Sequence, residues 1–308
     1  MLIGHACEIW RYPVKSMSGE RLSSCTIGPC GIAGDRGWAL RDEVAGEIRG
    51  AKYLPKLLLC SARYRTAPSG TTIPDVEIRF PDGSTVSSDD PDVAARLSTF
   101  LGRRVSLWPI QPAADRSHYK RAQAGATILG WISRHRLLRP HIARIIRYAG
   151  QEGEARAVFG REPDEPLPEF AAIPSELFEF TSPPGTYFDA FPIHLLTTAS
   201  IETMRRRNST ADWNVRRFRP NFLIATASAT GCLEETSWGH RTIRIGHVSL
   251  RCEGPTVRCA MTMHAQEGLA RDSTILRTIV RDADQNFGAY ARPIGDGVID
   301  EGAAVRLQ

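Results

Sequence analysis

The chain has 308 residues, of which 24% are charged and 42% hydrophobic, and its formal net charge is +5. A charge of this size permits anionic ligands without requiring a nucleic-acid polymer, so we expect no such polymer as a partner. No apolar run approaches the roughly 20 residues that cross a bilayer, and the N-terminus lacks the apolar stretch of a signal peptide. The sequence therefore predicts a cytoplasmic protein without a transmembrane segment, large enough for one or two domains.

The seven cysteines are odd in number and scattered, which argues against a disulfide framework and favours reduced thiols. Cys25 and Cys30 have the spacing that opens a plant-type ferredoxin cluster, but the second pair of that motif does not follow. We therefore expect no iron-sulfur centre. For any one of these thiols, the common alternative to a functional role is that of a buried structural cysteine.

The first hundred residues alternate short strands with turns. Strands are predicted at residues 7–12, 38–41, 76–80 and 84–86, and the turn signal Pro81-Asp82-Gly83 joins the last two. Residues 92–101 then predict a short helix that Gly102 closes. This part of the chain indicates a β-rich α+β unit.

The middle of the chain differs in charge. Residues 116–151 contain no acidic residue, and Gly130 and Pro140 interrupt their helical pattern. Such a segment is either a solvated helical face on an insertion or a docking surface for an acidic partner or a membrane. Residues 152–184, rich in proline and acid, predict an extended linker on the surface. The cations of the basic segment include Lys120, Arg121, Arg134, Arg136, Arg139, Arg144 and Arg147.

The last third of the chain returns to strands. Residues 200–207 predict a helix with Thr198 or Ser200 as its N-cap. Strands are predicted at 222–225, 242–245, 248–252 and 298–307, with glycine turns at Gly239, Gly246 and Gly302. Several strands separated by short turns favour a barrel or a sandwich. The predicted fold class is mixed α+β and β-rich.

Three short motifs place cations beside turns. In YPVKS, Lys15 and Ser16 follow a proline and could present an ammonium and a hydroxyl to an anion. In GDRGW, Arg36 follows a glycine-rich turn. In RFRPN, the proline biases Arg219 toward an extended conformation, which would point Arg219 and Asn221 to the same side of a strand. Taken singly, each motif is more typical of a surface salt bridge or a turn.

The stretch GPTVRCAMT places a thiol, Cys259, next to a cation, Arg258, in a strand-like run that begins at a Gly-Pro turn. A phosphate-bearing ligand needs several cationic donors, an amide recognises a heterocycle, and a thiolate binds a soft metal. Together the four motifs indicate a site for a ligand that combines these groups. His194, which follows Pro192 in an apolar run, is interpreted as a structural histidine.

Seven segments, taken in chain order, resemble one family: YPVKSMSGE, GIAGDRGWAL, LLTTAS, RFRPNFLI, VRC, NFGAY and GDGVIDEGAAVRL. The family is the MOSC family, named for the C-terminal domain of molybdenum cofactor sulfurase, and includes the mitochondrial amidoxime reducing component and its bacterial counterparts. The resemblance implies an N-terminal MOSC-type β-barrel-like domain over residues 1–115 and a MOSC β-barrel with peripheral helices over residues 187–308. A basic helical insertion with a proline- and acid-rich linker, residues 116–186, would separate them.

The resemblance also implies a molybdenum-molybdopterin cofactor between the two domains. Cys259 would be the thiolate ligand of the molybdenum and the catalytic residue. Cations of the first domain would hold the phosphate and pterin end of the cofactor. Carried over by motif, the cofactor-binding residues would be Lys15, Ser16, Arg36, Thr197, Ser200, Arg219, Asn221 and Arg258.

The implied reaction is the reduction of N-hydroxylated small molecules, such as amidoximes, hydroxylamines and N-hydroxy bases. Some bacterial relatives append a ferredoxin domain, whereas this chain stops just after its last predicted strand. We therefore expect electrons from a separate protein, a flavoprotein reductase or a small redox carrier, with the basic segment as its candidate dock. Two alternatives stay open: a sulfur carrier with a persulfide on Cys259, and a protein that binds the cofactor without catalysis.

Overall fold

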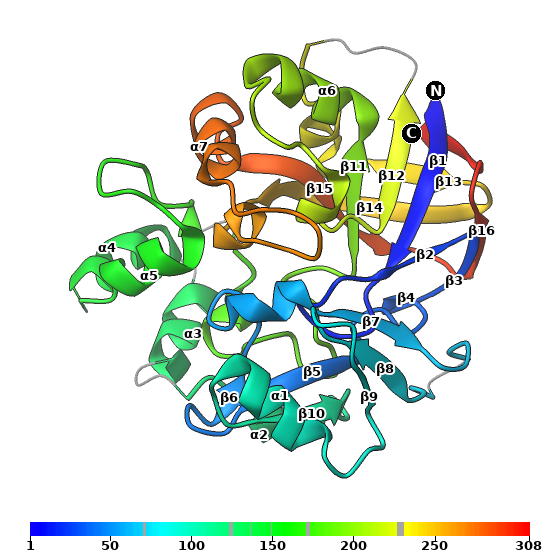
Figure 1. Cartoon of the computed structure of the whole chain (residues 1–308). Coiled ribbons are helices and arrows are strands. Elements are labelled where there is room, and N and C mark those ends of the chain that lie inside the picture. Colours follow the sequence, from blue (N-terminus) through cyan, green and yellow to red (C-terminus); the bar gives the residue numbers. More distant parts are fainter. Residues whose placement is uncertain (70–71, 123–125, 136, 149, 171–172, 227–230) are drawn as a thin grey trace.

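The computed structural model describes residues 1–308 except 70–71, 123–125, 136, 149, 171–172 and 227–230. Arg136 of the predicted basic surface therefore lies outside the described residues, as does the side chain of Arg147. The predicted fold class, mixed α+β and β-rich, is confirmed: a closed barrel forms one half of the molecule and smaller sheets form the other (Figure 1). Within the described ranges, every helix is too short or too polar to cross a membrane.

The barrel is closed by a strand from the start of the chain. β1 pairs with both β12 and β17, so that the sheet returns on itself. β11 and β12 are parallel, and the other neighbours in the barrel are antiparallel. The two termini meet, since the ammonium of Met1 donates to the carbonyl of Leu307 at 2.7 Å. In order around the barrel, the strands are β1 (Leu2–Arg11), β12 (Phe222–Thr226), β11 (Ile193–Thr197), β15 (Asn286–Pro293), β14 (Val248–Val257), β13 (Thr242–Ile245) and β17 (Ala304–Leu307).

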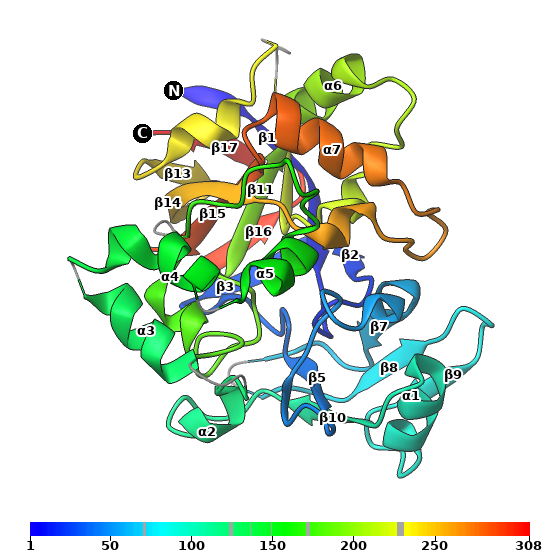
Figure 2. The ribbon, with the colours of Figure 1, turned by 90° about the vertical axis from the view of Figure 1, so that its left-hand side faces the viewer.

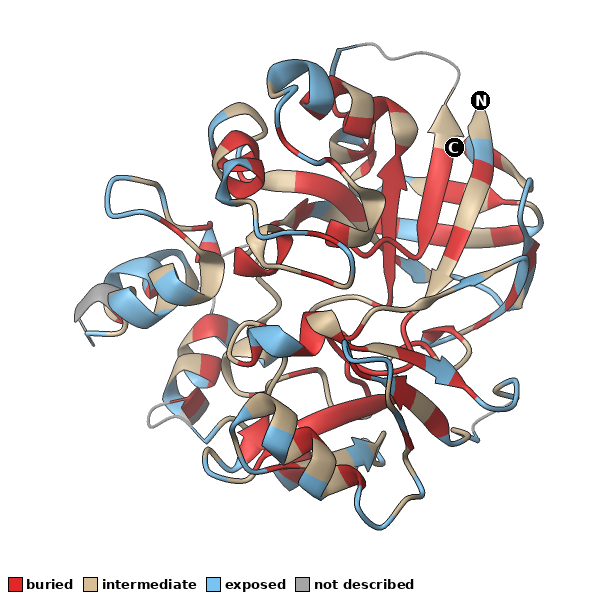
Figure 3. Cartoon of the chain, in the orientation of Figure 1, coloured by how far each residue is buried: buried red, intermediate tan, exposed pale blue. Residues whose placement is uncertain are grey.

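Apolar side chains that alternate along the strands fill the barrel. In β14, Val248, Leu250 and Cys252 are buried, whereas the residues between them are at least partly exposed. β11 is buried throughout, because Leu195 faces the barrel interior and Leu196 packs with helices α6 (Thr198–Arg207) and α7 (Ser273–Asp282). A continuous apolar run is typical of a strand that is covered on both faces. Figure 3 shows this contrast between the buried barrel strands and the exposed outer surfaces of the helices.

The other half holds three small sheets and a second apolar core. Helix α1 (Val93–Leu101) ends at Gly102 in the left-handed conformation, as the sequence predicts, and α2 (Arg116–Tyr119) follows. β16, near the C-terminus, pairs with β3, so that one of the sheets joins the two halves. The sheets are β10 (Val105–Pro109), β5 (Trp38–Asp42) and β6 (Glu47–Ile48); β7 (Ser61–Tyr64), β8 (Val76–Arg79) and β9 (Thr85–Ser87); and β16 (Gly297–Asp300), β3 (Ser24–Gly28) and β4 (Gly31–Ile32), while β2 (Glu20–Leu22) extends the barrel sheet beside β1.

Three helices from the middle of the chain gather at one side of the molecule: α3 (Ala126–Arg134), α4 (Ile142–Tyr148) and α5 (Glu152–Phe159) (Figure 2). The prediction of an extended linker from residue 152 is wrong over α5. Glu152 and Glu154 lie in its first turn, where carboxylates favour the positive end of the helix dipole, and Gly160 ends it in the left-handed conformation. The linker prediction gave more weight to the prolines after residue 160 than to these two helix signals.

Smaller differences occur at caps and turns. Thr197, rather than Thr198 or Ser200, is the N-cap of α6, and its hydroxyl accepts from the backbone N–H of Ser200 at 3.0 Å. Gly254 lies inside β14 at a bulge, so the Gly-Pro pair does not begin that strand. The predicted strand at 298–307 consists of β16 and β17 with a turn between them.

Gly288→Ala is expected to destabilise the barrel strongly. Gly288 in β15 has a φ of +95°, and a Cβ there would lie 2.1 Å from Nε2 of the buried His194. We expect the free energy of unfolding to fall by about 3 kcal/mol, from backbone strain and overpacking together. Gly302→Ala is the control, because Gly302 also has a positive φ but lies in open space; it should cost about 1 kcal/mol. Urea unfolding followed by circular dichroism measures both, and equal losses would contradict the steric explanation.

Candidate functional site

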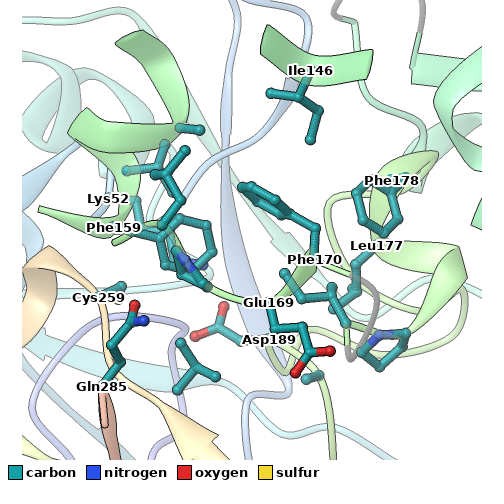
Figure 4. Close-up of a pocket in the computed structure, with 18 of the residues that line it drawn as sticks. Lys52, Ile146, Phe159, Glu169, Phe170, Leu177, Phe178, Asp189, Cys259 and Gln285 are labelled. Carbon is teal, nitrogen blue, oxygen red and sulfur yellow. The ribbon is translucent and has the colours of Figure 1, made fainter. Parts of the chain in front are cut away.

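A cavity of about 570 Å³ lies between the barrel, the loop after β6, and helices α3 to α5 (Figure 4). Its lining has two chemically different sides. One side is mostly apolar and comes from residues 129–178, and Figure 4 shows Phe178 there, across the cavity from Cys259. The other side is polar and includes Lys52, Asp189, Cys259, Gln285 and Tyr290.

Cys259 lies two residues after the end of β14 and directly precedes the 3₁₀ helix η7 (Ala260–Met263). Its thiol is unpaired, and its side chain is half-buried against Ala51 and Met261. The residue before it is held from just beyond α5, because Arg161 donates to the carbonyl oxygen of Arg258 at 3.0 Å. The thiol therefore lies on the cavity wall at a backbone position that this hydrogen bond supports.

Lys15 is buried beside the cavity and is paired with Asp189. Its ammonium donates to Oδ1 of Asp189 at 2.8 Å and to the carbonyl of Tyr187 at 2.6 Å. Burial lowers the pKa of Lys15, and the carboxylate of Asp189 opposes that shift. Burial would raise the pKa of Asp189, but Lys15 and Lys52 hold it well below its usual range. Asp189 is therefore an anion at neutral pH, and its carboxylate lies on the cavity wall.

Lys52 and Tyr290 belong to the cavity although the sequence analysis did not single them out. Burial would lower the pKa of Lys52, but Asp189 and Cys259 raise it above the usual value, so Lys52 is an ammonium. Burial and the nearby Asp189 raise the pKa of Tyr290 to about 12, so its hydroxyl keeps its proton. Tyr290 lies in NFGAY, one of the segments that resemble the family, so the sequence could have pointed to it. Lys52 lies in none of those segments, so there was no reason in the sequence to select it.

Arg36 and Arg219 stack on the ring of the buried Tyr12. Their guanidinium carbons lie 5.2 Å and 4.1 Å from the ring centroid. Asp35 forms an ion pair with Arg36 and accepts from Nδ2 of Asn221 at 3.0 Å. Residues of the motifs YPVKS, GDRGW and RFRPN are thus brought into one cluster behind the cavity.

Arg219 has a φ of 54°, so the predicted extended conformation is wrong. The cation-π contact with Tyr12 and a hydrogen bond from Nη1 to the carbonyl of Met17 compensate the left-handed backbone. Among the described residues, Nη2 of Arg219 and Nε of Arg258 are buried without a hydrogen-bond partner. Burial lowers the pKa of Arg219 to about 10 and also lowers that of Arg258. Arg219 therefore stays protonated at neutral pH, and its unused donor, like that of Arg258, suits an anion.

Backbone strain is concentrated around this site. Six non-glycine residues in the described part of the chain have a positive φ, and five of them lie in the cavity wall or the cluster behind it. Each such residue costs about 1–2 kcal/mol and persists only where surrounding contacts fix it. The five are Ser16, Arg36, Arg219, Asp284 and Gln285.

Three predicted site hydroxyls are used elsewhere. Oγ of Ser16 accepts from the backbone N–H of Ala51 at 2.9 Å and so fixes the loop that carries Lys52. Thr197 and Ser200 donate to the buried carboxylate of Glu235 at 2.9 Å and 2.5 Å. Of the nine predicted site residues, Cys259 lines the cavity; the other eight, Thr197 and Ser200 included, are not among the described residues that line it. Thr197 and Ser200 hold the start of α6 through these hydrogen bonds.

Two regions of the chain match known families. Residues 4–114 match the MOSC N-terminal beta barrel domain, and residues 183–306 match the MOSC domain. The chain belongs to the MOSC domain family. MOSC domains are associated with proteins that bind the molybdenum cofactor. Residues 115–182 of this MOSC protein, which include α3 to α5, lie between the two matched regions.

Solved structures similar to this MOSC protein include the YUAD protein from Bacillus subtilis, with 10% identity, 99% of this chain and 94% of that chain covered, and a TM-score of 0.43. YiiM from Geobacillus stearothermophilus has 17% identity and a TM-score of 0.30, with 38% of this chain and 54% of that chain covered. YiiM from Escherichia coli has 11% identity and a TM-score of 0.29, with the same coverage of 38% and 54%. The chain thus spans about half the length of these YiiM proteins. No curated protein matches the chain.

Asp189→Asn should destabilise this MOSC protein, because it removes the counterion of a buried ammonium. The expected loss in the free energy of unfolding at pH 7 is about 2 kcal/mol, less than for a fully buried pair because 47% of the Asp189 side chain is accessible. In the variant, the folded-state pKa of Lys15 lies further below its unfolded value, so stability rises with pH between the two and the loss shrinks toward pH 10.

Chemical unfolding of wild type and Asp189→Asn at pH 6, 7 and 9 measures this effect. The double variant Lys15→Met, Asp189→Asn removes the uncompensated charge and should recover part of the lost stability. A loss that is the same at each pH, or that the double variant does not reduce, would show that the ion pair is not the cause.

Proposed function

We propose that the protein is a molybdenum-cofactor-dependent oxidoreductase that reduces N-hydroxylated compounds. The main support is the position of the Cys259 thiol on the wall of a cavity whose polar side is backed by buried cations. Membership of the MOSC family supports the choice of cofactor. The division of the chain into domains at residues 1–115, 116–186 and 187–308 remains part of this proposal.

The residues around the cavity fit an anionic cofactor that carries a soft metal. Behind the cavity, three buried cations and one partly buried cation stand against two carboxylates, the buried Asp35 and the partly exposed Asp189, so this cluster has an excess of positive charge that an anion would neutralise. The cavity wall in front of the cluster is more acidic, because it carries Glu154, Glu169, Glu253 and Asp284. The free donor atoms of Arg219 and Arg258 would bind that anion, and Cys259 would supply the thiolate ligand. In this proposal Ser16 and Asn221 position the loops of the site. The buried cations are Lys15, Arg219 and Arg258, and the partly buried one is Arg36.

The reaction breaks an N–O bond, consumes two electrons and two protons, and yields an N–H group and water. When bound, the molybdenum cofactor supplies the two-electron exchange with the oxygen atom. The protein's own side chains would orient the substrate and supply protons. Lys52 is an ammonium and Tyr290 a protonated phenol, and both line the cavity, so each can donate a hydrogen bond to the departing oxygen.

The electrons would come from a separate flavoprotein reductase or small redox carrier. Helix α3, within the basic segment 116–151, exposes the side chains of Ile128 and Trp131, and an apolar patch beside cations suits transient docking of an acidic protein. A cytoplasmic location is supported by the seven cysteines, all of which are free thiols.

Cys259→Ser tests the proposal. Wild type produced in a host that makes molybdopterin should contain about one molybdenum per chain by elemental analysis and should reduce benzamidoxime with dithionite-reduced viologen as the electron donor. The serine variant should lose more than about 100-fold in turnover, because a hydroxyl does not replace a thiolate ligand. Cys30→Ser, at an exposed thiol, is the matched control and should keep full activity.

The other outcomes identify the alternatives. Molybdenum without turnover in wild type would indicate a cofactor binder, and a cyanolysable sulfur on Cys259 without molybdenum would indicate a sulfur carrier. Unchanged turnover in Cys259→Ser would remove this thiol from the mechanism.

A further inference from the structure

We infer that the described residues within 126–178, here called the canopy, select substrates in which an apolar, aromatic body carries the N-hydroxy group. The nature of the reacting group rests on the proposed function; the selection of the body rests on the cavity itself. One matched MOSC region ends before the canopy and the other begins after it. The apolar wall therefore comes from the part of the chain between the two regions.

The cavity has a polar end, and the wall contributed by the canopy is mostly apolar, with Gln151, Glu154 and Glu169 as its polar residues. Cys259, Lys52 and Gln285 lie at one end, where Figure 4 shows them facing the space. A molecule that fills the cavity would therefore place its polar head against these groups and its body against the canopy. The apolar canopy side chains that line the cavity include Leu129, Ile146, Phe159, Phe170, Leu177 and Phe178.

The canopy has a core of its own that keeps these side chains in place. Ile142, Ile146 and Phe170 are buried in it, while Phe159 and Phe178 are partly buried and keep surface toward the cavity. The rings of Phe159 and Phe170 meet edge to face, with centroids 6.1 Å apart. Edge-to-face packing leaves ring surface available, which suits stacking of a further aromatic group.

The canopy is also tied to the polar side of the cavity. The guanidinium of the buried Arg161 donates to Oε1 of Gln285 at 2.9 Å and 3.0 Å, in addition to its bond to the carbonyl of Arg258. Beside it, Gly160 packs so closely on Ala260 that a Cβ would lie 3.1 Å from the Cα of Ala260. The end of α5, which carries Phe159 of the apolar wall, is thus tied to the backbone on both sides of Cys259.

A volume of about 570 Å³ is in the range of pockets that enclose drug-sized molecules. An acetyl-sized body would leave most of the canopy wall in contact with water, whereas a naphthyl body would cover it. Each added ring buries enough apolar area to strengthen binding by roughly tenfold.

The test uses neutral carboxamides, which have no N–O bond to reduce and are not repelled by the cations of the site. Binding of acetamide, benzamide and naphthalene-2-carboxamide to the full-length protein as purified is measured by ligand-observed NMR and calorimetry. We expect affinity to rise roughly tenfold with each ring. Leu177→Asn, at a half-exposed cavity position, should weaken the naphthyl probe about tenfold and leave acetamide unchanged. Leu177→Met keeps an apolar side chain and should stay within about twofold.

Leu137→Asn is the control on the same insertion, because Leu137 is 75% exposed and does not line the cavity. Equal affinity for the three probes in wild type, or an unchanged naphthyl affinity in a folded Leu177→Asn, would overturn the inference. The wild-type series needs no variant and so decides the matter even if Leu177→Asn does not fold. If affinity rises with each ring but benzamidoxime is not reduced, the proposed function is wrong and the role of the canopy stands. If benzamidoxime is reduced but affinity does not rise with each ring, the role of the canopy is wrong and the proposed function stands.

Discussion

The pairing of β1 with β12 is the constraint on which the site depends. Because the two strands are antiparallel, with Ile9 opposite Phe222, the residues that follow β1 lie beside the residues that precede β12. β11 runs parallel to β12, so the chain before β11, which carries Asp189, reaches the same end of the barrel. The hydroxyl of Tyr12 donates to the carbonyl of Pro220 at 2.9 Å and fixes this meeting point. Closing the barrel is therefore the same event as assembling the cationic cluster.

This assembly has an electrostatic cost. Removing guanidinium and ammonium groups from water is unfavourable, and burial lowers the pKa values of Lys15, Arg219 and Arg258 accordingly. Asp189 and Asp35 offset part of the cost, while donor atoms on two arginines stay unsatisfied. The unsatisfied donors and the left-handed residues around the cavity both lower the stability of the fold at this site. An anionic ligand would recover it, which is why a bound cofactor should also stabilise the protein.

The sequence could predict features that depend on neighbouring residues, but not those that depend on contacts between residues far apart along the chain. Strands with clear turns, such as β13, and the glycine-closed helix α1 were predictable from local pattern. The motif residues Lys15, Arg36 and Cys259 could be named because their neighbours form recognisable segments. Asp189 could not, because its role arises only from an ion pair with a residue 174 positions away. The left-handed Arg219 was also beyond local reasoning, since tertiary contacts with Tyr12 and Met17 override the preference set by the following proline.

The reactive side of the cavity and its apolar wall come from different parts of the chain, and this separates their effects. Barrel residues set the position of Cys259, whereas the canopy lies between the two regions that match MOSC domains. Most changes to the canopy would therefore alter how well a substrate body is bound without moving the thiol. Arg161 is different, because it belongs to the inserted region yet holds the carbonyl of Arg258, next to Cys259. Through this guanidinium, and through the close packing of Gly160 on Ala260, the insertion is coupled to the backbone that presents the thiol, so a replacement for the insertion would have to make equivalent contacts.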